Sequence, residues 1–120
     1  MNDSITFYWL PNCTTCQKAA KHLEERYHKI NEWRDLKLEP LGREEIARLA
    51  ERVGGASELF SRRARKYREL NLHDRELSTD DMLDLMAQEY TFIKRPVVVD
   101  GERAVAGFTG KNYDRFFDER

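Results

Sequence analysis

Two cysteines, Cys13 and Cys16, are the residues of this chain whose type and spacing could do redox chemistry. They stand just after a predicted buried strand over residues 5–10, where a helical pattern begins at Thr14. A cysteine at the start of a helix lies beside unpaired backbone N–H groups and the positive end of the helix dipole, which favour a thiolate. Such placement commonly lowers a cysteine pKa from about 8.5 towards about 7 or below. We therefore predict that Cys13 is a nucleophile.

Cys16 lies one helical turn after Cys13, on the same side of the predicted helix. From there its thiol could attack a mixed disulfide formed on Cys13, so we assign it the role of resolving thiol. Two other interpretations stay open. A Cys-x-x-Cys pair is half of a zinc site, although the remaining candidate ligands, His22, His28 and His73, form no closely spaced pair. Alternatively, both cysteines could fill the core as unreactive thiols.

A second feature is Lys94-Arg95-Pro96, which precedes a run of three valines. A proline that opens a strand cannot donate to the ladder, and in a tight turn its peptide bond can be cis. Arg95 would then stand at the start of that strand, where its guanidinium could hold an oxyanion or stabilise a thiolate. The alternative is an arginine that is simply solvated.

The elements that must position these residues follow the order β-α-β, a helical block, then β-β-α, which indicates an α/β protein. The first helix has an apolar face made of Ala19, Ala20, Leu23 and Tyr27. A capping box over 78–81 opens a later helix, and Thr109 could cap the last one. The other predicted elements are a strand over 29–35, helices over 46–53 and 64–70 with a stop at Gly54-Gly55, a hairpin formed by 96–101 and 103–108, and a closing helix with Tyr113, Phe116 and Phe117 on its inner face.

Composition narrows the class of function. The chain has 120 residues and a mass of 14.3 kDa, enough for one domain with one ordinary core. Its 21 Lys and Arg residues against 22 Asp and Glu residues leave no basic excess for direct nucleic-acid binding. No apolar run approaches the roughly 20 residues of a membrane span, and the first residues lack the pattern of a secretory signal. We expect a cytoplasmic protein without a membrane partner, in a compartment that keeps thiols reduced.

The basic cluster over residues 62–68 contains Arg62, Arg63, Arg65, Lys66 and Arg68. It could bind a phosphate or a partner. A solvated helix face that interacts with nearby acids is the favoured interpretation.

Together these residues resemble the arsenate reductase (ArsC) family, which includes Spx-type regulators and glutaredoxin-like relatives. The resemblance covers nearly the whole chain in order and at matching spacing, and is carried by the segments 7–19, 39–41, 59–63 and 95–99. It implies a thioredoxin-like fold with a four-stranded mixed sheet. It also implies a single domain over 1–120, with a helical insertion at about 43–90 that precedes a cis-proline at Pro96.

The same resemblance suggests roles for individual residues. Cys13 falls on the family's catalytic cysteine, and Arg95 on the arginine before the cis-proline. Arg62 or Arg63 lies near a second anion-site arginine of the true arsenate reductases, whose matching place is taken by Ser61. The third such arginine falls on Gly107. An oxyanion needs several convergent cationic donors, so these departures argue against arsenate as the substrate.

The sequence therefore predicts a thiol–disulfide redox protein that reduces a disulfide or a small oxidised substrate. It would hold no cofactor or metal, and a cellular thiol donor such as glutathione with glutaredoxin, or thioredoxin, would return it to the dithiol. The alternative implied by the resemblance is an Spx-type redox-switched regulator that contacts the RNA polymerase α subunit. Gly54-Gly55 falls near the surface that Spx uses for this contact, but it is also an ordinary helix stop.

Overall fold

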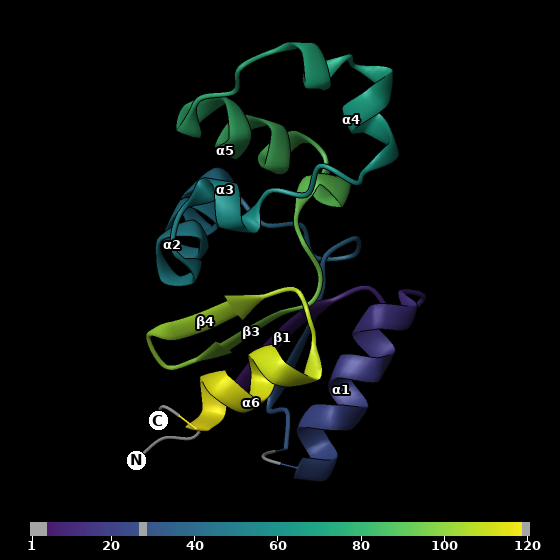
Figure 1. Cartoon of the computed structure of the whole chain (residues 1–120), viewed down its shortest axis with the longest axis vertical. Helices are drawn as coiled ribbons and strands as arrows, with labels where there is room; N and C mark the ends of the chain where they lie inside the picture. The colour runs from purple at the N-terminus through teal and green to yellow at the C-terminus, as the bar shows by residue number, and fades with distance from the viewer. Residues whose placement is uncertain (1–4, 27–28, 119–120) are drawn as a thin grey trace. The chain divides into compact units, whose positions relative to one another are not determined.

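The computed structural model describes residues 5–26 and 29–118, which form two compact units (Figure 1). The first unit comprises the described residues of Met1–Glu39 and Arg95–Arg120, and the second comprises Pro40–Lys94. Tyr27 and His28, which the sequence places on the first helix face and among the zinc candidates, lie outside the described residues.

The first unit is a mixed sheet with helices, as the fold class predicts. Its strands lie in the order β2-β1-β3-β4, with β2 parallel to β1 and the other neighbours antiparallel. The elements in chain order are β1 (Ile5–Trp9), α1 (Thr14–Arg26), β2 (Glu32–Asp35), β3 (Val97–Asp100), β4 (Arg103–Ala106) and α6 (Gly110–Asp118). This is the thioredoxin-like arrangement, in which the segment after β1 leads directly into α1.

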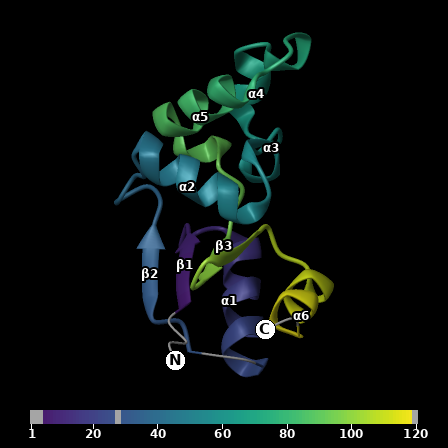
Figure 2. The same ribbon diagram turned by 90° about the vertical axis from the view of Figure 1, so that its left-hand side faces the viewer.

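The core of the first unit packs β1 and β3 against one face of α1 and one face of α6. Ile5 and Phe7 alternate along β1 and have no exposed surface, and Phe7 stands opposite Val98 in the antiparallel register. The predicted stripes of α1 and α6 complete this cluster with Ala19, Ala20, Leu23, Tyr113, Phe116 and Phe117. Both helices lie on the same side of the sheet (Figure 2). The packing holds the start of α1 in place against the end of β1.

The second unit is helical, and its boundaries follow local signals. It contains α2 (Arg43–Val53), α3 (Ala56–Leu59), α4 (Arg65–Glu69), a 3-10 turn η1 (Leu72–Asp74), α5 (Thr79–Gln88) and a second 3-10 turn η2 (Tyr90–Phe92). Gly54 ends α2 with φ +107°, a left-handed conformation that favours glycine. Ser78 Oγ accepts a hydrogen bond from Asp81 N at 3.0 Å, and Asp81 Oδ2 accepts one from Ser78 N at 3.0 Å, so the predicted capping box opens α5.

Several predicted boundaries differ from the structure. The second strand is shorter than the predicted 29–35 and begins at Glu32, which pairs with Thr6 of β1. Just before it, Ile5 N donates to Asn31 Oδ1 at 2.7 Å and Asn31 N donates to Ile5 O at 3.0 Å. The second hairpin strand ends at Ala106 rather than at 108. The short elements α3, η1 and η2 were not predicted, since three or four residues are too few to show a helical period. Among the described residues, no helix is long and apolar enough to cross a membrane.

Candidate redox site

The turn after β1 places Cys13 at the N-terminal end of α1. Cys13 N donates to Leu10 O at 3.0 Å, and Gln17 N donates to Cys13 O at 3.0 Å, the first bond of the helix. Gln17 Nε2 also donates to Pro11 O at 2.7 Å, which ties the turn to the helix that follows. Cys13 is therefore the residue immediately before α1, the position at which a side chain can accept from the free N–H groups of the first turn.

The two cysteine sulfurs differ in exposure. Cys13 is half-buried, whereas Cys16 has no exposed surface. Both are free thiols, and Cys16 N donates a hydrogen bond to Cys13 Sγ at 3.4 Å. A substrate can thus approach Cys13 from solvent, while Cys16 can be reached only from Cys13 or from the core. This asymmetry fits the predicted division between a nucleophile and a resolving thiol.

The two thiols also differ in pKa: the pKa of the more exposed Cys13 is lowered, and that of the buried Cys16 is raised. Burial raises the pKa of Cys13, but hydrogen bonds from Cys16 together with the charge and a hydrogen bond of Arg95 outweigh it, so the net pKa lies below its usual value. For Cys16, burial dominates and raises the pKa to about 12, with the neighbouring Cys13 adding to the increase. The thiolate therefore forms more readily on Cys13 than on Cys16, which holds its proton at neutral pH.

Arg95 and Pro96 lie in the same unit as the cysteines, at the entry to β3. The Arg95–Pro96 peptide bond is cis. Arg95 is half-buried, and its guanidinium lowers the pKa of Cys13 through its charge and a hydrogen bond. Pro96 O accepts a hydrogen bond from Gly107 N at 2.8 Å, so the end of β4 stands beside the cis-proline. Position 107 has φ +79° and carries no side chain, which means that this place beside the site supplies no cation.

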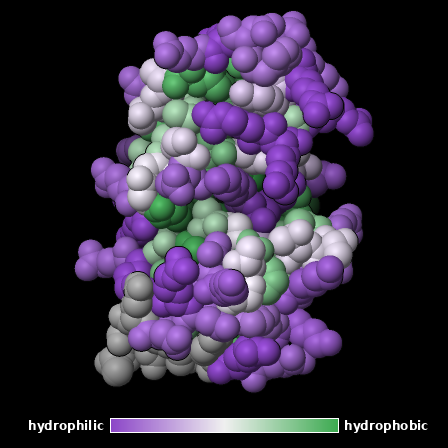
Figure 3. Space-filling view, in the orientation of Figure 1, coloured by the Kyte–Doolittle hydropathy of each residue, from purple (hydrophilic) through white to green (hydrophobic). Residues whose placement is uncertain are grey.

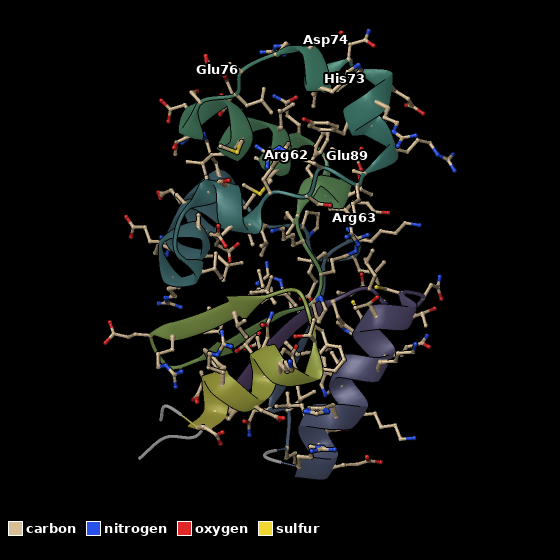
Figure 4. The ribbon with its side chains drawn as sticks, viewed as in Figure 1. Arg62, Arg63, His73, Asp74, Glu76 and Glu89 are labelled. Atoms are coloured by element: carbon tan, nitrogen blue, oxygen red, sulfur yellow. The ribbon has the colours of Figure 1, made fainter. Side chains whose placement is uncertain are left out.

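Arg62 and Arg63 belong to the second unit, in the segment between α3 and α4 (Figure 4). Both are exposed, and the Arg62 guanidinium stands 5.5 Å from the ring centroid of Phe60. Arg63 N donates to Ser61 Oγ at 3.3 Å. The structure brings Cys13, Cys16, Arg95 and Pro96 together in one unit. An anion-stabilising role for Arg62 and Arg63 stays a prediction.

The rest of the basic cluster lies exposed on a short helix. Arg65, Lys66 and Arg68 are exposed on α4, and Lys66 Nζ stands 3.9 Å from Glu69 Oε1. Strongly hydrophilic residues cover much of the α4 region in the face that Figure 3 shows. These contacts agree with a solvated face that interacts with nearby acids.

No group of three or more His, Cys, Asp or Glu residues within 5–26 and 29–118 is arranged to hold a metal ion. His22 Nε2 lies 3.3 Å from Asp114 Oδ1 in the first unit, and His73 Nε2 lies 3.6 Å from Asp74 Oδ1 in the second. The histidines considered as zinc ligands for Cys13 and Cys16 are therefore engaged with carboxylates where they are described.

Two participants in the site were not predicted in this role. Gln17 carries no signal beyond its position after the cysteine pair, and the Gly107 N–H depends on hairpin register. Tyr113 was predicted as part of an inner helix face, which it is, but its hydroxyl has no hydrogen-bond partner among the described residues. A tyrosine at a core position of a helix is the only sequence feature that could have drawn notice to it.

Comparison with known proteins matches residues 8–116 to the model of the ArsC family. The uncharacterised protein YusI of Bacillus subtilis is 40% identical over 114 residues, covering 92% of this chain and 96% of the relative. The global transcriptional regulator Spx of Enterococcus faecalis is 34% identical over 113 residues, covering 93% and 85%. The solved structure of a possible arsenate reductase from Streptococcus mutans is 29% identical, with a TM-score of 0.75 and coverage of 94% and 99%.

Proposed function

Because the chain belongs to the ArsC family, we propose that it is a thiol–disulfide redox protein in which Cys13 attacks and Cys16 resolves. One observation carries the proposal: a half-buried cysteine with a lowered pKa stands one turn before a fully buried cysteine with a raised pKa. A pair of inert core thiols would show no such contrast, since burial alone raises the pKa of both.

The reaction follows from the positions of the two sulfurs. The Cys13 thiolate attacks a sulfur of a disulfide, forming a Cys13 mixed disulfide and releasing the other half as a thiolate. Cys16 then attacks Cys13, closing the Cys13–Cys16 disulfide and expelling the bound half. A small oxidised substrate would be reduced by the same two electrons. A cellular thiol, either glutathione with glutaredoxin or thioredoxin, returns the pair to the dithiol, so these are the proposed partners in the cytoplasm.

The surroundings of Cys13 support a disulfide as the substrate over arsenate. Arg95 acts on Cys13, but Gly107, which lies beside Pro96, supplies no second cation. Losing two of three charged hydrogen bonds to a doubly charged oxyanion would cost several kcal/mol, at roughly 1.5–3 kcal/mol each. A disulfide carries no such charge requirement at the reacting sulfur.

Mass spectrometry of single-cysteine variants tests the two roles. After mild oxidation the wild-type protein should contain a reducible Cys13–Cys16 disulfide. With a small disulfide substrate, Cys16→Ser should accumulate the mixed disulfide on Cys13, and Cys13→Ser should lose turnover. Retained turnover in Cys13→Ser, or no Cys13–Cys16 disulfide in the wild type, would refute the proposal.

A parallel assay identifies the substrate class and the donor. Arsenate and a small disulfide are each offered with glutathione and glutaredoxin, or with thioredoxin and its reductase. We expect reduction of the disulfide without reduction of arsenate. Arsenate turnover would contradict the reasoning from position 107.

A second candidate function is suggested by relatives named as Spx regulators, of which one is 34% identical over 93% of this chain. In this case oxidation of the same cysteine pair would alter a surface that binds the RNA polymerase α subunit. Pull-down with that subunit, using reduced and oxidised protein, separates the two. Absence of binding in both states would remove the regulatory candidate.

A further inference from the structure

The Tyr113 hydroxyl is a buried polar group whose purpose the fold does not explain. Tyr113 on α6 has no exposed surface, and its hydroxyl has no hydrogen-bond partner among the described residues. Such a group costs free energy, and native proteins keep few of them. The Tyr113 ring is held edge-on by Phe108, with centroids 4.7 Å apart, and by Phe117 at 6.2 Å. A phenylalanine would keep these contacts without the cost of the hydroxyl.

Tyr113 packs against the part of α1 that follows Cys16. It belongs to one buried cluster with Ala19 and Ala20, which stand three and four positions after Cys16 and therefore share its face of the helix. Cys16, like Tyr113, has no exposed surface. Burial raises the pKa of Tyr113, and charge on Cys16 raises it further, so the phenol remains protonated and can act as a donor.

Cys16 must become a thiolate at the moment of resolution, in a place that water does not reach. A buried thiolate needs a hydrogen-bond donor in place of solvent. We propose that the Tyr113 hydroxyl is a positioning group that donates a hydrogen bond to the Cys16 thiolate while it attacks the mixed disulfide. This inference rests on the proposed redox function, and it explains why a donor without a partner is kept in the core of the reduced protein.

The step balances without a further reactant. The Cys16 sulfur forms a bond to Cys13 Sγ while the bond from Cys13 to the substrate half breaks. The substrate half takes the electron pair of that bond and leaves with the proton of the Cys16 thiol, which it carries to solvent. Tyr113 keeps its own proton throughout, since it stabilises the charge without accepting it.

Stopped-flow reaction of the full chain with dithiobis(nitrobenzoate) separates the two events. Attack by Cys13 releases one coloured thiolate, and resolution by Cys16 releases the second. In Tyr113→Phe we expect the first phase to stay within about twofold of wild type. The second should be slowed about tenfold near pH 7, the lower end of what a hydrogen bond to a charged group contributes. The pH midpoint of this second phase should also rise.

Tyr67→Phe removes a hydroxyl from α4 in the second unit and serves as the matched control, with both phases unchanged. Cys16→Ser should lose the second phase. A second phase in Tyr113→Phe with wild-type rate and pH midpoint would overturn the inference while leaving the redox function intact. A wild-type protein with no second phase would instead overturn the redox function. Loss of the thermal unfolding transition in Tyr113→Phe would assign the hydroxyl to stability and would likewise overturn the inference.

Discussion

The two units of the molecule use charged side chains in different ways. In the first unit, Arg95 and Cys13 are both half-buried, and the charge and a hydrogen bond of Arg95 help to lower the pKa of the thiol despite its burial. In the second unit, Arg43 Nε lies 2.6 Å from Asp84 Oδ1 on α5, a close contact between two exposed side chains. Water screens such pairs, whereas partial burial strengthens the effect of a charge. Short distances alone do not identify a site, and burial of both partners matters more.

The units also differ in how their boundaries arise. α2 ends at Gly54, a glycine with positive φ, and α5 begins at the capping box formed by Ser78 and Asp81. The surroundings of Cys13 combine a turn at the start of α1 with the cis-proline segment before β3, brought together by the sheet order. These ends of α2 and α5 can therefore be predicted from neighbouring residues, whereas the surroundings of the candidate redox site depend on segments far apart in the chain.

The largest expected effect is the difference in reactivity between the two thiols. With the Cys13 pKa below its usual value and the Cys16 pKa raised to about 12, iodoacetamide at pH 7 should alkylate Cys13 at least about 1,000-fold faster than Cys16. Peptide mapping after timed alkylation measures both rates, and urea-unfolded protein, in which the rates should converge, is the control. Comparable rates in the folded protein would remove the asymmetry on which the redox function rests.

Replacing Arg95 should have the next largest effect. Arg95→Ala should raise the Cys13 pKa by about one unit, since an opposite charge near an ionised group commonly lowers its pKa by that much or more. The shift is measured as the pH midpoint of Cys13 alkylation, and Arg95→Lys, which keeps the charge but loses the planar fork, should shift it less. An unchanged midpoint in Arg95→Ala would show that the helix start alone activates Cys13.

The lowered pKa of Cys13 also makes the stability of the reduced protein depend on pH. Since the pKa of Cys13 is lower in the folded protein, its ionisation stabilises the reduced fold above the unfolded-state pKa. That contribution disappears as the pH falls through the folded-state value. It should be smaller in Arg95→Ala.

Removing the capping box should affect stability and leave the chemistry alone. Ser78→Ala should lower the free energy of unfolding by about 1 kcal/mol, because Asp81 N loses its acceptor. Denaturant unfolding measures this, and exposed Ser57→Ala on α3 is the matched control. Any change in the Cys13 alkylation rate of Ser78→Ala would contradict the separation of the two units' roles.

The smallest effect is expected from the basic cluster. The double replacement Arg62→Ala and Arg63→Ala should move the Cys13 pKa by less than about 0.3 units, since both side chains are exposed and screened by solvent. The alkylation midpoint again provides the measurement. A shift equal to that of Arg95→Ala would assign these arginines the anion-stabilising role that the family resemblance suggests.

Local features of the site were predictable from the sequence. The strand ending before Pro11, the helix beginning at Thr14 and the cap at Thr109 follow from alternation, turn residues and capping chemistry within a few positions. Thr109 Oγ1 accepts from Asn112 N at 3.0 Å, as predicted. The position of Cys13 at the start of α1 belongs to this group.

Features that join distant parts of the chain were not predictable in the same way. The bonds between Asn31 and Ile5 and the pairing of Gly107 N with Pro96 O depend on strand register, which one strand does not specify by itself. The second unit adds short elements, such as α3, that arise from packing and not from a periodic pattern.

The pattern of residues is enough to predict two cysteines one turn apart at the start of a helix, and an arginine before a proline at the start of a strand. The tertiary structure adds that Cys16 is fully buried, that Arg95 lowers the pKa of Cys13, and that the buried Tyr113 hydroxyl has no hydrogen-bond partner among the described residues. The reason is physical. Helix starts and caps depend on hydrogen bonds between near neighbours, whereas burial and electrostatic effects depend on which distant segments the sheet brings together.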